Sequence, residues 1–342
     1  MRKRIISIIC ILCLGLCLLT SCSKKNKEEE TAPAINFLED TVFAVNGEQV
    51  SEGEWNLYAK PTLDETNVIY GKDIWSYKMN PDGKLFGESL QESIRERIVN
   101  VKLVAAQAES LGVKLTEDEK IEISISAGEY LDKLSESDKK ELGITAEVVE
   151  KVYSDNLLAT KVYENLTLNV DTNTEETEVR HMVLNYIMQP KTYEDKEGNT
   201  CLYSNEEIEI SRAGLESIRE KASVSKEVTL KDYETEKYVV TEIITDLKGL
   251  KDRLPEDMAG IVFWLRQGEV SRVLESDEAL FLFECVKLED EASTREARIR
   301  IIEQREKEVF SDAFEKWKEN VQVVNNPSVW KSITDRINAY GS

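Results

Sequence analysis

The chain has 342 residues, with 66 acidic against 44 basic side chains and a formal net charge of −22 at pH 7. A surface of this charge repels nucleic acid and anionic headgroups, so neither is an expected partner, and the acidity itself is best explained by solubility. The sequence contains one histidine and no CxxC pair, which argues against a zinc constellation, and no metal or other cofactor is expected.

Residues 1–21 predict a lipoprotein signal peptide. The basic start MRKR precedes the apolar run IISIICILCLGLCLL, which is short for a membrane-spanning helix but has the length of a signal-peptide core. The run ends in LTSC, which resembles the bacterial lipobox, so Cys22 is the expected lipid anchor. The alternatives are an ordinary cleaved signal and an uncleaved anchor, in both of which Cys22 is incidental. The lipobox interpretation places the mature chain at the extracytoplasmic face of the cell membrane.

Residues 22–39 are expected to form a flexible tether, because SKKNKEEETAPAIN is polar and charged and has no apolar period. Beyond the leader and Cys22, the only cysteines are Cys201 and Cys285. In an extracytoplasmic compartment these two could pair, or both could remain free.

Residues 40–175 predict the N-terminal part of a helical domain. It opens with a short strand at 41–45 and a turn at Asn46-Gly47. Helices are expected at 90–112 with Gly112 as the stop, from a capping box at Thr116 through Leu134, and at 144–166. The expected core stripes of the first two helices are Leu90, Ile94, Ile98, Val101, Ala105 and Ala108, and then Ile121, Ile125, Gly128, Leu131 and Leu134.

Residues 176–290 predict an α+β domain. The stretch EVRHMVLNY (178–186) alternates like a strand and holds the only histidine, His181. The expected elements that follow are a loop at 187–203, a helix from Ser204 through Ala222, a strand at 237–246, a short helix at 254–265, a turn at 268–271 and an apolar strand at 279–288.

Residues 291–342 predict a C-terminal helix at 292–321 with Ile302, Val309, Ala313 and Trp317 on its buried face. One solitary helix cannot bury such a stripe, so it is expected to pack back onto the first helical block and complete that domain. The predicted fold class is therefore α+β, with a helical domain built from both chain ends and an α+β domain inserted into it.

The order of motifs along the chain resembles the extracytoplasmic foldases of the PrsA/SurA type. The lipobox and tether are followed by AVNGEQVSEGEW, AAQAESLGVKLTEDE, RHMVL and LRQGEVS. The resemblance implies a SurA-N-like chaperone domain and an inserted parvulin-type peptidyl-prolyl isomerase domain. It implies a membrane-anchored foldase whose partners are unfolded or partly folded secreted polypeptides, and it allows a homodimer.

The resemblance also implies a site. Rotation about an X–Pro bond crosses a barrier of roughly 20 kcal/mol, so a catalyst needs an apolar pocket for the proline ring and polar groups that favour the twisted amide. Carried over position by position, the family pattern assigns His181 as the catalytic-network histidine. It assigns Leu254, Met258 and Phe263 to the proline pocket, with plain core packing as the alternative. Phe281 stands at the same pocket, where the family has its second histidine.

The replacement by Phe281 predicts weak or lost isomerase activity, because a phenyl ring can neither donate nor accept a hydrogen bond. His181 then lacks its partner, and we expect its ring to bond to local backbone or to a single neighbour. Asp232 and Asp246 are both arguable as the family's further polar residue, and neither is assigned.

Three functions are compatible with the sequence: an active prolyl isomerase, a foldase that has lost catalysis, and a non-catalytic envelope lipoprotein that binds a solute or scaffolds a complex. The foldase is the prediction. Trp55, Tyr58, Trp75 and Tyr77 are candidates to line its client-binding surface, with core packing as the alternative.

Overall fold

The computed structural model describes residues 35–79, 83–224 and 228–340. The expected signal peptide, the lipid anchor Cys22 and most of the expected tether lie outside these residues. Within them, no helix is long and apolar enough to cross a membrane. The chain divides into two compact units, one of residues 1–169 with 306–342 and one of residues 170–305.

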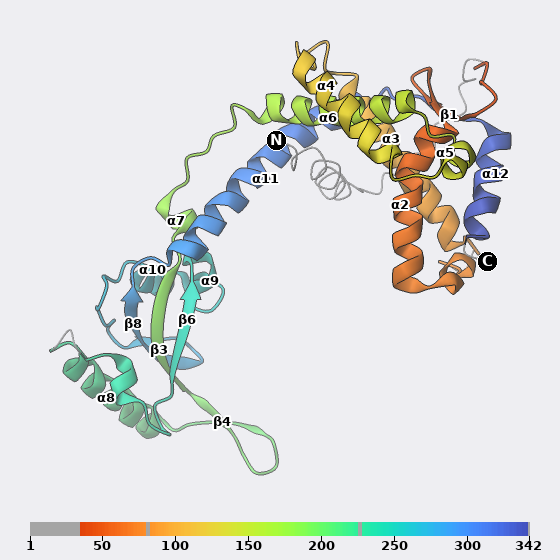
Figure 1. Ribbon diagram of the computed structural model, residues 1–342. Coiled ribbons are helices and arrows are strands. Elements are labelled where there is room, and N and C mark those ends of the chain that lie inside the picture. The colour runs from red at the N-terminus through yellow and green to blue at the C-terminus, as the bar shows by residue number, and fades with distance from the viewer. Residues whose placement is uncertain (1–34, 80–82, 225–227, 341–342) are drawn as a thin grey trace. The chain divides into compact units, whose positions relative to one another are not determined.

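The first unit consists of helices and one small sheet, with strand order β2-β1-β9 (Figure 1). Its elements are β1 (Thr41–Val45), β2 (Glu48–Ser51), α2 (Glu52–Tyr70), η2 (Lys72–Ser76), α3 (Phe86–Ala105), α4 (Glu117–Leu131), α5 (Glu136–Leu142), α6 (Ala146–Thr167), β9 (Val323–Asn325) and α12 (Pro327–Asn338). The helix α11 (Glu291–Lys318) begins in the second unit and continues into the first.

The sheet of the first unit joins the two ends of the chain. Asn46 and Gly47 have φ angles of 50° and 88°, which are the positive values that a tight type I′ hairpin between β1 and β2 requires. On its other side β1 pairs with β9, and the amide of Asn46 donates to the carbonyl of Gln322 at 2.8 Å. The expected helical domain built from both chain ends is therefore confirmed.

Among the described residues this unit has three apolar clusters, and two of them join the two ends of the chain. In the first, β1, α2, α3 and α12 pack around Trp55, whose ring lies 5.7 Å from that of Trp330. In the second, α3 and α6 pack against Phe310 and Phe314 of α11. Both cores thus draw side chains from each end of the chain.

The buried face of α4 differs from the expected stripe. Ile121 and Ile125 are 59% and 50% exposed, while Ile123 and Ala127 are buried. Apolar residues occur on both sides of this helix, so periodicity alone allows either face, and packing against α6 selects one of them.

The buried face of α11 is also shifted from the expected one. Val309 is 41% exposed, and Phe310 and Phe314 are buried in its place. These two rings lie 5.8 Å apart, and the ring of Trp317 lies 6.4 Å from Phe310. The aromatic rings bury more area than the expected Val309 and Ala313, which explains why they face the core.

The second unit is an α+β unit with a four-stranded antiparallel sheet of strand order β6-β3-β8-β7. Its elements are α7 (Glu176–Val179), β3 (Met182–Pro190), β4 (Thr192–Glu194), β5 (Thr200–Leu202), α8 (Asn205–Ala222), η3 (Leu230–Tyr233), β6 (Val240–Thr245), α9 (Leu247–Lys251), α10 (Glu256–Phe263), β7 (Leu274–Glu275) and β8 (Ala279–Lys287). The expected α+β class, with an α+β unit inserted in a helical one, is confirmed.

Several expected boundaries change. The strand β3 begins after His181 and continues to Pro190, and the segment expected as a loop contains the hairpin β4–β5. The helix α3 ends at Ala105, and turns occupy the residues up to Gly112, which has a φ of 67°. The sequence placed domain boundaries after residues 175 and 290, whereas the compact units divide after Asn169 and Arg305.

Candidate functional site

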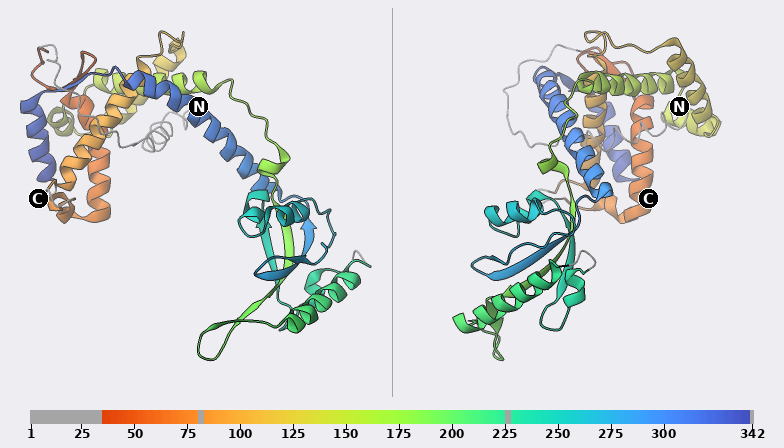
Figure 2. Two further views of the ribbon diagram at one scale, coloured as in Figure 1. Left: turned by 180° about the vertical axis from the view of Figure 1, so that it is seen from behind. Right: turned by 90° about the vertical axis from the view of Figure 1, so that its left-hand side faces the viewer.

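The sheet of the second unit is covered differently on its two faces (Figure 2). On one face, Ile187, Leu280 and Leu282 pack against α8. On the other face, alternate residues of β3 and β8 pack with α9 and α10. This alternation follows from the two-residue period of a strand, and it places aromatic residues of both strands on the same side.

A groove of about 570 Å³ opens on the face that carries α9 and α10. Its floor is a row of three aromatic rings. The ring of Phe283 lies 5.4 Å from that of Tyr186 and 6.0 Å from that of Phe281, and the interplanar angles are 28° and 20°. Phe281 and Phe283 keep only 9% and 3% of their surface exposed, so the stacked rings form a closely packed apolar base for the groove.

The walls of the groove are apolar and its rim is polar. Ile243 of β6 forms one wall, and Leu250 and Leu254 form another. The rim includes Thr192 and Arg253 together with the loop 276–278.

The rim loop is held by Lys191 at the end of β3. Its backbone amide donates to the carbonyl of Glu278 at 2.8 Å, and its ammonium donates to the carbonyl of Ser276 at 2.7 Å. The same ammonium pairs with Glu275 at 2.7 Å. The loop is therefore fastened to the sheet, and the groove has a fixed edge.

The four residues assigned to the pocket separate into two pairs. Leu254 and Phe281 line the groove. Met258 and Phe263 belong to the core on the same face, and Phe263 has no exposed surface. The guanidinium of Arg180 covers the ring of Phe263, with 4.0 Å between its carbon and the ring centroid, and also donates to the Phe263 carbonyl. A proline ring entering the groove cannot touch Phe263 unless this packing opens.

The structure separates His181 from the groove. In the sheet register Phe281 pairs with Met188, and the end of β8 lies opposite the start of β3. Seven residues at ~3.3 Å each place His181 roughly 20 Å along the strand from Phe281. The pairing register therefore places His181 away from the groove that Phe281 lines.

The surroundings of His181 are local backbone and α11. The Nδ1 atom lies 2.9 Å from the carbonyl oxygen of Val179, and since a carbonyl only accepts, this bond requires the proton on Nδ1. The His181 amide donates to Thr294 Oγ1 at 3.1 Å, and its carbonyl accepts from the Asp290 amide at 2.7 Å. The histidine thus joins the start of β3 to the start of α11.

The two aspartates left unassigned both cap helices. Asp246 accepts from the Gly249 amide at 2.7 Å at the start of α9, and Asp232 accepts from the Thr229 amide at 2.7 Å beside η3. Each carboxylate satisfies a backbone donor that a helix start leaves open. Neither residue lines the groove.

Sequence reasoning missed Tyr186, Ile243, Leu250 and Phe283 as groove residues. A signal for two of them was present, because Tyr186 follows Leu184, and Phe283 follows Phe281, at the strand period of two. What the sequence lacked was the register that brings Tyr186 opposite Phe283.

The candidate aromatics of the first unit are largely core. Trp55, Tyr58 and Trp75 are buried, and Tyr77 alone of the four is exposed. Tyr77 belongs to a short stretch that exposes large apolar side chains, namely Val68, Ile69, Tyr70, Tyr77 and Met79. These side chains lie at the C-terminal end of α2 and just after η2, and they form an additional apolar surface of the helical unit.

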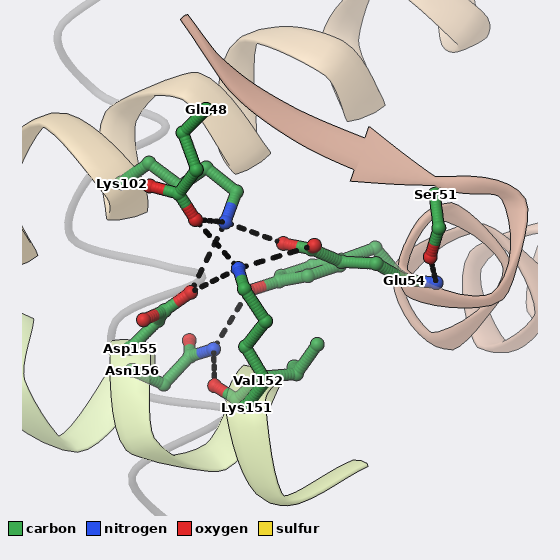
Figure 3. A network of polar contacts seen from close by, with 9 residues as sticks. Glu48, Ser51, Glu54, Lys102, Lys151, Val152, Asp155 and Asn156 are labelled. Carbon is green, nitrogen blue, oxygen red and sulfur yellow. Dashed lines mark hydrogen bonds and ion pairs between the residues drawn. The ribbon is translucent and has the colours of Figure 1, made fainter. Parts of the chain in front are cut away.

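A cluster of charged residues lies inside the first unit (Figure 3). The ammonium of Lys102, whose side chain is 3% exposed, lies 2.7 Å from Glu54, 2.8 Å from Glu48 and 3.1 Å from Asp155. Lys151 contacts the same three carboxylates at 2.6 to 3.4 Å. We call these five residues the Lys102 cluster.

Every charge in the Lys102 cluster has an opposite partner. Burial by itself lowers the pKa of Lys102, but Glu54 and Asp155 outweigh it and hold that pKa above the usual value. Burial likewise raises the pKa of Glu48, but hydrogen bonds from Lys102 and Lys151 outweigh it and lower that pKa. Both shifts favour the charged forms, so the cluster acts as a structural junction of β2, α2, α3 and α6.

No metal centre is evident among the residues that the structure describes, where no group of three or more histidine, cysteine or acidic residues is arranged to hold an ion. The lining of the groove offers hydroxyl, guanidinium and carboxylate groups at its rim and aromatic carbon at its floor. This arrangement suits the binding of an apolar segment of polypeptide.

No family model and no curated protein matches the chain. Its structural matches include solved PrsA and SurA-like proteins. One is from a study of PEB4 and Cj1289, SurA-like chaperones of Campylobacter jejuni, with 13% identity, a TM-score of 0.29, and coverage of 84% of this chain and 99% of that chain. Another is the foldase PrsA from Lactococcus lactis, with 12% identity, a TM-score of 0.30, and coverage of 87% and 98%.

A further match is the peptidylprolyl isomerase PrsA from Bacillus cereus, with 14% identity, a TM-score of 0.25, and coverage of 86% of this chain and 89% of that chain. Identities and TM-scores this low transfer neither an activity nor site residues.

Proposed function

We propose that this chain is a membrane-anchored extracytoplasmic foldase that holds unfolded segments of secreted proteins and has weak or no prolyl isomerase activity. The observation that carries the proposal is the groove over Tyr186, Phe281 and Phe283, which is apolar at its floor and polar at its rim. An unfolded chain exposes apolar side chains in many sequences, and an open groove with an aromatic base can accept them without selecting one.

The weak isomerase activity follows from what surrounds the floor. A catalyst of X–Pro rotation must stabilise the twisted amide with placed polar groups, in addition to gripping the ring. In this unit the histidine lies roughly 20 Å along β3 from the groove by strand length, and the position opposite Met188 is the phenyl ring of Phe281. The groove can therefore bind a proline segment, but it has few polar groups that would stabilise the twisted amide of the transition state more than the planar amide.

The anchoring part of the proposal is supported by the LTSC sequence that ends at Cys22 and by the acidic, polar segment that follows it. A lipid on Cys22 would hold the folded units near the outer face of the membrane, where secreted chains emerge unfolded. Metabolic labelling with a radioactive fatty acid tests this part, because Cys22→Ala should lose the label and appear in the soluble fraction.

The holding activity is tested with the mature chain, residues 22–342, carrying Cys22→Ser so that it remains soluble. Light scattering of reduced insulin should be suppressed by this protein at near-stoichiometric amounts. Tyr186→Asp places a charge on the groove floor and should weaken the suppression about tenfold. Tyr193→Asp makes the same change at an exposed position of β4 and should leave it unchanged.

The catalytic part is tested on the same preparation by NMR exchange on a proline tetrapeptide. We expect a rate close to that of the uncatalysed peptide. A rate like that of an efficient isomerase, lost in Tyr186→Asp, would contradict the loss of catalysis and leave the groove as an active site. Absence of both activities would favour the alternative, a lipoprotein that binds a solute or scaffolds a complex.

A further inference from the structure

The strand β6 lies at one end of the sheet order β6-β3-β8-β7 and pairs with β3 along its whole length, from Val240 opposite Ile187 to Thr245 opposite Met182. In the part of the chain that the structure describes, no strand lies beside its other edge (Figures 1 and 2). In such a strand alternate residues turn their backbone N–H and C=O groups away from the sheet. Among the described residues, no other element hydrogen-bonds to the backbone of 240–245.

This edge lacks the features that usually block pairing. The sequence VTEIIT contains no proline and no lysine, and its register against β3 is continuous without a bulge. By contrast, the opposite edge strand β7 has only two residues. Five of the six residues of β6 are valine, isoleucine or threonine, which favour strands. A long, flat and unblocked edge is a template for another strand.

The one charge on β6 is already engaged. Glu242 pairs with Lys231 of η3 at 2.6 Å. This ion pair holds the carboxylate on the face of the sheet that α8 covers. Two residues further along the strand, Ile244 has 53% of its surface exposed. A strand added beside β6 would cover this side chain and remove apolar surface from water.

We propose that the free edge of β6 binds an extended segment of an unfolded polypeptide as an added fifth strand. The chemistry of the edge identifies this ligand, because a row of alternating amide donors and carbonyl acceptors matches an extended backbone. Ile243 is both a residue of β6 and a wall of the groove, so the added strand runs beside the groove and its alternate side chains lie next to Ile243. The inference rests on the proposed function, since its ligand is the client.

The negative charge of the chain favours a client segment, and not a second copy of this chain, as the added strand. The whole chain carries a formal net charge of −22, so two copies repel each other as they approach. Antiparallel self-pairing of β6 would also bring two Glu242 side chains close together. A neutral or basic segment rich in β-branched residues is repelled neither by the net charge of the chain nor by Glu242.

The test uses the mature chain with Cys22→Ser and an acetylated peptide of alternating valine and threonine with a lysine at each end. Hydrogen exchange followed by mass spectrometry should show amides within 240–245 exchanging about tenfold more slowly at saturating peptide. The amides of β7 should not change. Protection confined to the groove helices, or no protection in 240–245 when the peptide is bound, would overturn the proposal.

A matched pair of variants locates the site. Ile244→Lys adds the charge that natural edges use to prevent pairing, at a side chain already half in water, and should weaken peptide binding about tenfold. Ile210→Lys makes the same change on α8 at a side chain of similar exposure, 56%, and should leave binding unchanged. The opposite ranking would place the peptide beside α8 and overturn the proposal.

The outcomes also separate this inference from the proposed function. If Tyr186→Asp weakens the suppression of client aggregation while Ile244→Lys weakens neither suppression nor peptide binding, the groove alone holds clients and the edge proposal fails. If the chain suppresses no aggregation at all, the proposed function fails. Protection of 240–245 that rises with protein concentration in the absence of peptide would show self-pairing and would also overturn the proposal.

Discussion

The Lys102 cluster in the first unit and the aromatic groove in the second unit differ in whether their side chains already have partners within the protein. In the cluster, Lys102 is buried among three carboxylates, and each charge has a partner within 3.4 Å. In the groove, the stacked rings of Tyr186 and Phe283 border an open hollow of about 570 Å³. Satisfied polar groups indicate a structural role, whereas an open hollow lined by apolar side chains indicates a place for a ligand.

The largest expected effect on stability comes from removing the charge of Lys102, and it tests whether the Lys102 cluster is structural. Lys102→Met removes the cation that faces the buried carboxylate of Glu54, and we expect the free energy of unfolding to fall by about 3–5 kcal/mol. Lys151→Met is the control, because its side chain is 42% exposed and its loss should cost less than about 1 kcal/mol. Urea unfolding followed by circular dichroism measures both; equal effects would mean that the cluster is open to solvent.

A similar effect is expected beneath the groove at Phe263. Phe263→Ala should lower the stability of the second unit by about 3–5 kcal/mol, because the ring is fully buried under Arg180. Trp264→Ala removes the neighbouring ring, which is 60% exposed, and should cost about 1 kcal/mol or less. Thermal unfolding compares the two variants. If Phe263→Ala keeps full stability and loses client binding, Phe263 is part of the binding surface after all.

A smaller effect is expected from pH. The pKa of Glu48 is lowered from 4.5, so the unfolded chain takes up a proton at a pH where the folded chain does not. Stability from this group is therefore present above pH 4.5 and is lost as the pH falls through the folded pKa. Glu48 is half exposed, so the contribution should be below about 1 kcal/mol. Unfolding curves between pH 6 and pH 3 should converge for the parent and Glu48→Gln at low pH, and a stability difference that stays constant over this range would contradict the expectation.

The last prediction concerns chemical labelling of the two cysteines and requires no substitution in the protein. Both are free in the structure; burial raises the pKa of Cys285 to about 11, and Cys201 lies half-buried in the hairpin β4–β5. At pH 8 we expect iodoacetamide to modify Cys201 first and Cys285 only after unfolding. Peptide mass spectrometry gives the order. A Cys201–Cys285 disulfide in the purified protein, or faster labelling of Cys285, would contradict the closed packing beneath the groove.

Placement of the expected site residues shows where sequence reasoning reached its limit. Leu254 and Phe281 do meet at the groove, but Met258 and Phe263 are core residues, and His181 lies at the far end of β3. A motif spaced along the chain fixes which residues lie on one helix or strand. It does not fix the register between β3 and β8, which is a property of two segments about 100 residues apart.

The sequence by itself determined the features that depend on neighbouring residues. The Asn46-Gly47 turn, the capping boxes at Thr116 and Ser204, and the α+β class all follow from local backbone preference and periodicity. The tertiary structure alone decided which face of α4 and α11 is buried, that Tyr186 stacks on Phe283, and that β6 has a free edge. These features depend on packing and strand order between distant segments, and residue spacing within one element carries no information about them.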